Sequence, residues 1–343
     1  MFANKHIHFV VIPEDSQKGI LPCPKERQIF FDLWKRQQLR PWTNEMKVIP
    51  QLQQDQNHWK EIKNTYPVLY KGLTNIILFF LCSDELARDI TTSKILQYFP
   101  SIWVNNMFTA HGNTEIVHNE SYSLLADVRF TNYIERQNAE KYAMSLPSIK
   151  AMISWAEKYS SDDTNTLLEL RDPSYLGIML LQFICFEGIF FTGWFAIIYA
   201  VKARGKFPAL VSANEYIAPD EADHVENTVA AYHALSRRVE ESLVNEIFKS
   251  AVNIAKEFLY DGFENDVPDY DIYRGDIAEY IELVCNVILE KLKYPPLYPD
   301  AKLKLKYIKN KDFNIFASIH ESSDPNYRPA TSNGKVVNPF DEL

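Results

Sequence analysis

The chain has 343 residues, of which 46% are hydrophobic and 24% are charged, an ordinary balance for a globular protein with a sizeable buried core. Its formal net charge of −9 argues against a nucleic-acid-binding surface, so no nucleic-acid partner is expected. The four cysteines are widely spaced and form no Cys-x-x-Cys motif, so we interpret them as reduced thiols and expect a cytoplasmic protein.

Helical patterns dominate the sequence, whereas strand signals are few and glycines number only 10. The predicted helices cover residues 25–38, about 58–90, about 101–127, about 130–158, 173–205, 214–248 and, in at least two pieces, 246–291. The segment 39–55 is mixed and polar, and the end at 322–343 is rich in Ser, Pro, Asn and Gly, which predicts a disordered tail. We therefore expect an all-α bundle with one helical domain at 25–317, an irregular segment at 1–24 and a flexible C-terminal tail at 318–343.

Residues 180–201, LLQFICFEGIFFTGWFAIIYAV, are long and apolar enough to cross a membrane, yet they carry Glu187 near their centre. No other stretch has this character, and the N-terminus shows no signal-peptide pattern. A helix that is apolar all round is also typical of the centre of a large bundle, so we expect a buried helix and no membrane partner. A buried carboxylate has to be neutralised, paired or bound to a cation, and Glu187 therefore points to a specific role.

Two Glu-x-x-His motifs, TEIVH and DEADH, bring Glu115 together with His118 and Glu221 together with His224. Residues at i and i+3 share one face of a helix, so each motif aims a carboxylate and an imidazole at one point. Either motif alone is also compatible with a pair of surface residues. Two such motifs on two predicted long helices favour a common site.

Two further acids, each alone on its helix, complete the predicted set of ligands. Asp84 follows the apolar run NIILFFLC and Glu187 lies in the apolar helix, so two helices offer one acid each. One acid from each of two helices, with an acid and a histidine from each of two others, is the ligand arrangement of ferritin-like bundles that bind two metal ions. Four carboxylates neutralise two divalent cations, and such ligands suit iron or manganese. The predicted metal ligands are Asp84, Glu115, His118, Glu187, Glu221 and His224. The alternative for Glu187, a protonated acid hydrogen-bonded to the backbone, leaves the other five unexplained.

From about Trp34 to the C-terminus, the chain resembles the small, radical-generating subunit of class I ribonucleotide reductase. The most specific stretch is EIVHNESY, because in that family a tyrosine four residues after the first motif's histidine becomes a stable radical, and here it is Tyr122. Ordinary ferritins and desaturases do not share this spacing. The resemblance also implies an apolar shield around the radical, for which the candidates are Phe191, Phe195 and Ile217.

The resemblance implies a route by which the radical leaves the site. Asp220 matches an acid that bridges a ligand histidine and a tryptophan. Trp42 is the expected tryptophan, with Trp34 and Trp59 as alternatives, because the context of Trp42 departs from the family pattern. Tyr327 matches a mobile tyrosine that relays the radical across the subunit interface.

The resemblance further implies a homodimer and a large-subunit partner, on which the acidic and hydrophobic C-terminus NPFDEL would dock. The implied cofactor is a pair of iron ions, with manganese or a mixed pair as alternatives. The dimetal site would react with oxygen and oxidise Tyr122, and the radical would pass to the large subunit, which reduces ribonucleotides to deoxyribonucleotides. Two alternatives remain: a ferritin-like dimetal oxidase or hydroxylase that acts on its own substrate, and an iron-storage or scaffold protein. Tyr122 and the tyrosine-bearing tail argue against both.

Overall fold

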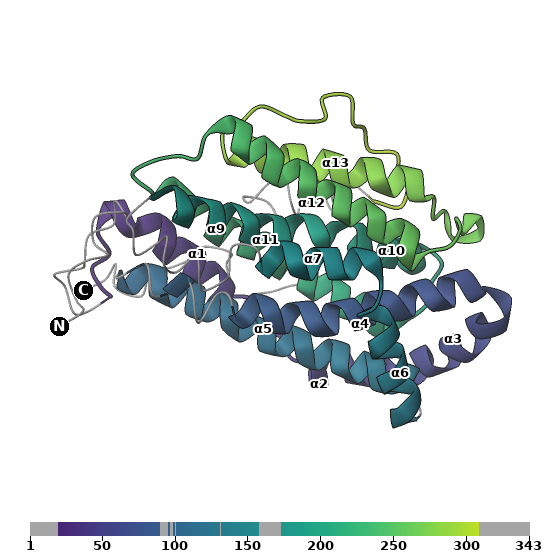
Figure 1. Cartoon of the computed structure of the whole chain (residues 1–343). Coiled ribbons are helices and arrows are strands. Elements are labelled where there is room, and N and C mark those ends of the chain that lie inside the picture. Colours follow the sequence, from purple (N-terminus) through teal and green to yellow (C-terminus); the bar gives the residue numbers. More distant parts are fainter. Residues whose placement is uncertain are drawn as a thin grey trace.

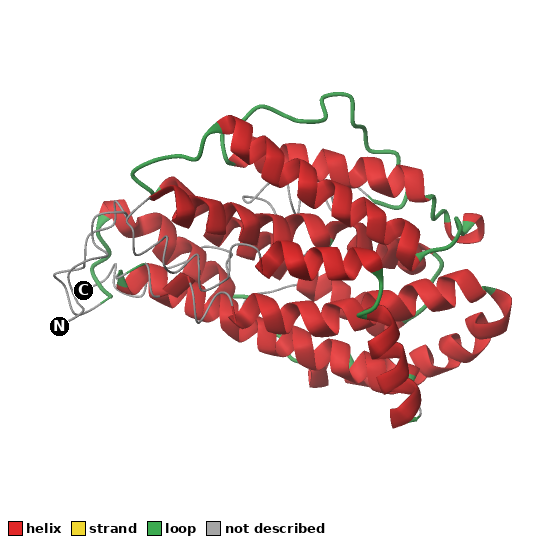
Figure 2. Ribbon diagram, in the orientation of Figure 1, coloured by secondary structure: helices red, strands yellow, loops and turns green. Residues whose placement is uncertain are grey.

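The computed structural model describes residues 20–89, 95, 96, 99, 101–130, 132–157 and 173–308. Within these ranges the regular elements are helical, apart from one isolated bridge between Val267 and Ile272 (Figure 2). The helices are α1 (Gln28–Gln38), α2 (Asn44–Lys47), α3 (Leu52–Thr65), α4 (Pro67–Asp89), α5 (Ile102–Arg129), α6 (Tyr133–Ala143), α7 (Pro147–Glu157), α9 (Pro173–Cys185), α10 (Thr192–Ala203), α11 (Pro208–His233), α12 (Glu241–Gly262) and α13 (Arg274–Lys291). The all-α prediction is therefore confirmed for the described part of the chain.

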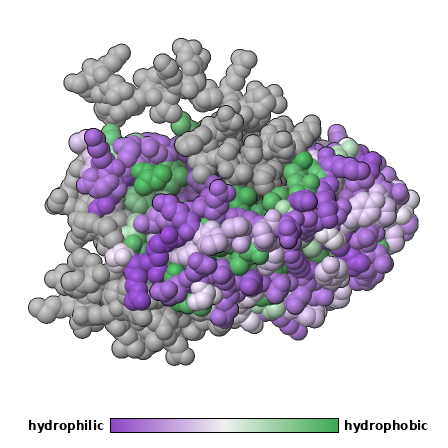
Figure 3. Space-filling model, turned by 90° about the horizontal axis from the view of Figure 1, so that it is seen from above, coloured by the Kyte–Doolittle hydropathy of each residue, from purple (hydrophilic) through white to green (hydrophobic). Residues whose placement is uncertain are grey.

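The long helices form a bundle in which α5 and α11 hold central positions (Figure 1). Helix α5 packs against α1, α4 and α11, and α11 packs in turn against α9 and α10. Helices α12 and α13 pack against each other in the upper part of Figure 1, and α12 also packs against α7, α9 and α4. Seen from above, the described surface is mainly hydrophilic with smaller hydrophobic areas (Figure 3), so the apolar residues are concentrated inside the bundle.

The apolar segment predicted to be a buried helix crosses the interior of the bundle. Helices α9 and α10 are joined by a π-helical turn, η5 (Phe186–Phe190), and the apolar part of this continuous run spans 28 residues from Leu176 to Ala203. The most apolar part of this run has the composition of a membrane-spanning helix, but all of it is buried among the other helices. The prediction of a buried helix is confirmed.

The N-terminus of α11 is held by side chains of α3. Asp55 accepts hydrogen bonds from the backbone N–H groups of Ala209 and Leu210, both at 2.9 Å. The Phe207 N–H donates to Nδ1 of His58 at 2.9 Å, and Phe207 itself has the left-handed φ of 53°. The first N–H groups of a helix have no partner within it, so these bonds cap α11 from a neighbouring helix.

Three predicted elements have different limits in the structure. The expected helix at about 58–90 is two helices, α3 and α4, and the expected helix at about 130–158 is α6 and α7. Pro67 and Pro147 each begin the second helix of the pair, because proline lacks the N–H that would continue the first. The segment 39–55, read as mixed and polar, contains α2 and the start of α3.

The expected single helix at 214–248 is also wrong, since α11 ends at His233 and α12 begins at Glu241. The connection is held by contacts distant in sequence. The Val239 N–H donates to the Tyr232 hydroxyl at 3.0 Å, and the Tyr294 hydroxyl donates to the Val239 carbonyl at 2.6 Å. No proline or glycine marks this break, so the local sequence pattern could not show it. The predicted segments at 1–24 and 318–343 lie mostly or entirely outside the described residues.

Candidate dimetal site

Five of the six predicted ligands meet at one point inside the bundle. Glu115 and His118 come from α5, Glu187 from the π turn η5, and Glu221 and His224 from α11, and each side chain is at most 1% exposed. The i, i+3 spacing places each acid beside its histidine on one helix face, as predicted. Asp84 belongs to α4, and its side chain lies outside the described part of the structure.

Glu115 lies between two groups of donor atoms. Its Oε1 is 2.8 Å from Nδ1 of His224, and its Oε2 is 3.5 Å from Nδ1 of His118. His118 Nδ1 is also 3.0 Å from Oε1 of Glu221. The donor atoms of Glu115, His118 and Glu221 all lie within 4.8 Å of one another, and Glu115, Glu187 and His224 belong to a second such group. Glu115 is thus shared by two adjacent positions.

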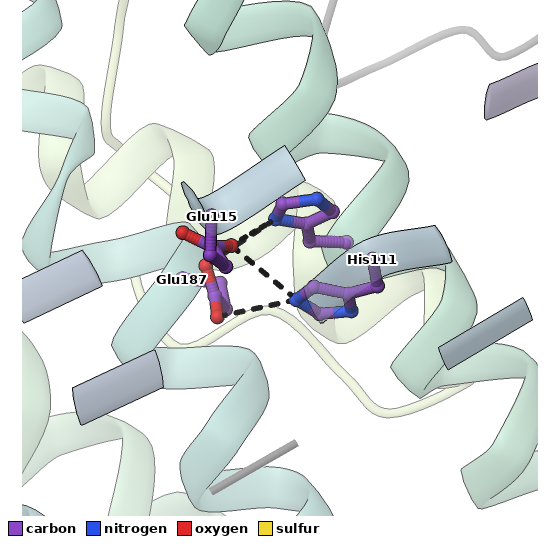
Figure 4. Close-up of side chains that lie close together, drawn as sticks. His111, Glu115 and Glu187 are labelled. Carbon is purple, nitrogen blue, oxygen red and sulfur yellow. Dashed lines mark ion pairs between the residues drawn. The ribbon is translucent and has the colours of Figure 1, made fainter. Parts of the chain in front are cut away.

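A residue that the sequence analysis missed, His111, belongs to the second group. Figure 4 shows His111, Glu115 and Glu187 pointing toward one another, with His111 one helical turn before Glu115 on α5. The signal was present in the sequence as a His-x-x-x-Glu spacing, because i and i+4 also share a helix face. A search restricted to Glu-x-x-His does not find it.

The protein residues alone give this cluster strongly perturbed pKa values. Burial raises the pKa of Glu187 to about 8, and the charges of Glu221 and Glu115 add to the effect. Burial also opposes the ionised form of Glu115, but the nearby His224 and the contacts with histidine nitrogens outweigh it and hold the pKa of Glu115 well below its usual value. Burial lowers the pKa of His224, yet the charges of Glu221 and Glu115 outweigh this and raise it well above normal. Glu115 and His224 therefore stabilise each other's charged forms, whereas burial and the neighbouring acids favour the neutral form of Glu187.

The two ligand histidines are oriented by polar groups on their outer sides. Nε2 of His224 lies 2.8 Å from the Thr114 hydroxyl, and Nε2 of His118 lies 3.4 Å from Oδ2 of Asp220. Both contacts leave the Nδ1 atoms facing the carboxylates. An acceptor behind a ligand imidazole fixes its tautomer and raises its basicity, which is the arrangement expected of metal ligands.

Trp42 is the tryptophan that the structure brings to Asp220. Its indole Nε1 donates to Oδ2 of Asp220 at 2.8 Å, and its ring lies 6.0 Å from that of His118 in a stacked arrangement. The loop that carries Trp42 is fixed to α5 by Asn44, whose amide donates to Glu120 at 2.7 Å.

The two alternative tryptophans lie elsewhere. Trp34 is half-buried and packs edge-on against Phe31, and Trp59 packs against Phe207 near the start of α11. The preference for Trp42 over both thus has a geometric basis, although its role stays a prediction.

Tyr122 is buried at 1% exposure, one turn after His118 on α5. Its ring stacks on Phe80 with centroids 4.6 Å apart, and Phe80 lies 5.3 Å from both Phe191 and Phe195. The expected apolar surroundings are present, but Phe80, which the sequence analysis did not name, makes the direct ring contact. Ile217 is buried as well. Tyr327 lies outside the described residues.

The donor set fits a pair of metal ions. Both carboxylate oxygens of Glu115 and of Glu187 are buried without a hydrogen-bond partner of good geometry. Buried acceptors of this kind are costly unless a cation satisfies them. Carboxylate oxygens with imidazole nitrogens are ligands that iron and manganese accept.

Comparisons with known proteins agree with this geometry. Residues 23–304 match the family model described as ribonucleotide reductase, small chain. The ribonucleoside-diphosphate reductase small chain of Nicotiana tabacum is 27% identical over 294 residues, which cover 84% of the present sequence and 84% of the relative. Subunit M2 of the same enzyme from Homo sapiens is 26% identical over 284 residues, covering 83% and 69%.

Solved structures show the same fold. The ribonucleotide reductase Rnr4 homodimer of Saccharomyces cerevisiae superposes with a TM-score of 0.73 at 19% identity and covers 89% of this chain and 92% of its own. A putative class I ribonucleotide reductase of Bacillus halodurans gives a TM-score of 0.69 at 16% identity, covering 80% and 96%. The predicted ferritin-like fold is confirmed.

Proposed function

The chain belongs to the ribonucleotide reductase small-chain family, and from this premise we propose that its buried carboxylate and histidine cluster holds two metal ions and makes Tyr122 a radical site. It is the small subunit of ribonucleoside-diphosphate reductase, the enzyme that supplies deoxyribonucleotides for DNA replication. The observation that carries the proposal is the pair of donor groups that share Glu115, with Tyr122 on the same helix.

The proposed ligands are the six residues Asp84, Glu115, His118, Glu187, Glu221 and His224. Iron is the proposed metal, because hard carboxylate oxygens and imidazole nitrogens suit it, and manganese or a mixed pair would use the same donors. When bound, the metal pair supplies the oxygen chemistry that oxidises Tyr122. The ring of Phe80 and the aromatic residues behind it keep water from the tyrosine.

Trp42 and Asp220 are proposed to carry the oxidising equivalent away from the site. Asp220 accepts the indole N–H of Trp42 and lies beside His118, so it links an oxidisable ring to a ligand of the site. Burial alone would raise the pKa of Asp220, but the hydrogen bonds and the charge of His118 outweigh it and lower the pKa. The carboxylate therefore stays ionised and can accept hydrogen bonds from both His118 and Trp42. Tyr327 in the tail is proposed as the next relay.

The proposed assembly is a homodimer that docks on the large subunit through the tail at 318–343, after a helical domain at 25–317 and an irregular segment at 1–24. Support for the partner comes from family membership, and support for the homodimer from the yeast relative's structure. We place the protein in the cytoplasm, in line with the wide spacing of its four cysteines and the lack of a Cys-x-x-Cys motif.

A dimetal oxidase or hydroxylase with its own substrate was the alternative, and family membership favours the reductase subunit over it. Reconstitution of the metal-free protein with Fe²⁺ and oxygen tests the proposal. We expect two metal ions per chain, a tyrosyl radical signal in low-temperature electron paramagnetic resonance, and reductase activity with the large subunit. A protein that binds the metals but yields neither radical nor reductase activity would contradict it.

A further inference from the structure

His111 has no place in the predicted ligand set, yet it points into the centre of the site. It is completely buried, and neither of its ring nitrogens has a hydrogen-bond partner. A buried imidazole left without partners is costly, so the ring needs a partner that the protein atoms do not provide.

The distances around His111 are those between two ligands of one cation. Its Nε2 is 3.5 Å from Oε1 of Glu115 and 3.6 Å from Oε1 of Glu187, which is too long for good hydrogen bonds. Two donor atoms that each lie about 2.1 Å from one metal ion are separated by about 3.0 to 3.5 Å. The donor atoms of His111, Glu115, Glu187 and His224 all lie within 4.8 Å of one another, so one ion can reach all four.

Packing holds the imidazole of His111 in this orientation. One face stacks on His224, with ring centroids 3.6 Å apart and an interplanar angle of 12°. The other aromatic neighbours are Phe183 at 5.5 Å and Phe108 at 6.0 Å. Because an imidazole binds a metal ion in its own ring plane, the two stacked rings have to tilt apart when one ion binds both.

We propose that His111 is a third imidazole ligand, bound through Nε2 to the metal ion that Glu187 and His224 also hold. This inference rests on the proposed dimetal function. It makes the two metal positions unequal, because one has two imidazoles with Glu115 and Glu187, whereas the other has His118 with Glu115 and Glu221. Imidazole nitrogens favour later divalent ions such as Co²⁺, whereas carboxylate oxygens favour Mn²⁺. Co²⁺ should therefore bind more tightly to the position with two imidazoles and fill it first.

The test titrates the metal-free full-length protein with Co²⁺ under anaerobic conditions and follows its visible absorption, which reports the ligands of cobalt. The variant is His111→Gln, which keeps a hydrogen-bond donor near Glu187 but removes the imidazole. The control is His233→Gln, which removes an exposed histidine at the end of α11. We expect two cobalt ions in the wild type and in the control. In His111→Gln, one of the two should bind at least about tenfold more weakly, with altered absorption.

A crystal structure of the cobalt-loaded wild type provides a reading that does not depend on folding of the variant. Anomalous scattering should place one cobalt ion within about 2.3 Å of His111 Nε2. Two cobalt ions with neither bonded to His111, or unchanged affinities and spectra in His111→Gln, overturn this inference and leave the dimetal function standing. A wild type that takes up no cobalt overturns both.

Discussion

Trp42 donates its indole N–H to Asp220, an acid 178 residues further along the chain, and the donor and acceptor atoms are 2.8 Å apart. The same carboxylate oxygen lies 3.4 Å from Nε2 of His118. One oxygen atom therefore connects an aromatic ring that can be oxidised to a proposed metal ligand, and both contacts can be removed separately by substitution.

Trp42→Phe should lower reductase activity with the large subunit by about 10- to 100-fold, while metal content and the Tyr122 radical stay near wild-type levels. Phenylalanine fills most of the space but neither donates to Asp220 nor is oxidised as easily as indole. Trp34→Phe and Trp59→Phe are matched controls, because both rings pack away from Asp220. Wild-type turnover in Trp42→Phe, or a comparable loss in either control, would assign the relay to another residue.

Tyr122→Phe should retain the metals and the fold but lose the tyrosyl radical signal and nearly all reductase activity. The ring contact with Phe80 persists, so the free energy of unfolding should change by about 1 kcal/mol or less. Tyr232→Phe removes a buried tyrosine hydroxyl elsewhere in the bundle, bonded to Tyr294 at 2.7 Å, and should keep the radical. A strong tyrosyl signal in Tyr122→Phe after oxygen exposure would mean that another tyrosine carries it.

Removal of the last six residues, NPFDEL, should leave metal binding and the Tyr122 radical intact and abolish activity by preventing docking on the large subunit. The synthetic peptide should inhibit the wild-type complex competitively at high concentration, since binding coupled to ordering is usually of modest affinity. Tyr327→Phe should instead dock normally but fail to turn over. A truncated protein with full activity would place the docking surface outside the tail.

Gly72→Ala should destabilise the protein by about 1 to 3 kcal/mol, because a Cβ on Gly72 would lie 2.2 Å from Cζ of the buried Phe263 ring. In a double variant, Phe263→Leu should remove part of the destabilisation caused by Gly72→Ala. Urea unfolding of the two single variants and the double variant would measure this coupling. Gly275→Ala is the control, because nothing lies within 4 Å of its Cβ position. Equal unfolding midpoints for Gly72→Ala and wild type would mean that the Phe263 ring moves aside freely.

The cap that Asp55 forms on α11 should depend on pH. Burial raises the pKa of Asp55 from 3.8 to about 6, although the N–H groups of Ala209 and Leu210 oppose the shift. Between pH 3.8 and 6, Asp55 is ionised in the unfolded chain but still protonated in the folded protein. Its contribution to the free energy of unfolding is therefore complete below pH 3.8 and is lost as the pH rises to 6. The loss is about 3 kcal/mol in the free energy of unfolding.

Urea unfolding of metal-free wild type and Asp55→Asn at several values from about pH 4 to about pH 7 measures this effect. Asparagine does not ionise, so the stability advantage of the wild type over the variant should shrink as the pH rises. A constant difference between the two would show that Asp55 ionises as it does in the unfolded chain.

Much of the site was predictable because it lies on helices, where sequence spacing fixes geometry. The i, i+3 spacing was enough to place Glu115 beside His118 and Glu221 beside His224. His111 obeys the same rule at i, i+4, a spacing that a Glu-x-x-His motif does not include. The contact between Phe80 and Tyr122 joins two helices, so no spacing within either helix reveals it.

Other features of the fold depend on contacts between distant segments. The bond between Trp42 and Asp220 depends on a loop whose path is set by the hydrogen bond from Asn44 to Glu120 on α5, and this contact has no periodic signal in the sequence. The break between α11 and α12 depends on Tyr232 and Tyr294, whose bonds to Val239 form only in the folded bundle. Local patterns therefore predicted element types better than element ends.

The π turn at Phe186–Phe190 restricts insertions and deletions in this part of the chain. A π turn contains one residue more than an α turn, so losing one residue there would rotate α9 relative to α10 by about 100°. Both helices are buried on every side from Leu176 to Val201, so no solvent-facing side is available to receive the displaced residues. Insertions and deletions among natural variants should accordingly be absent from 176–201 and should accumulate in exposed connections between helices, where the backbone can absorb a change in length.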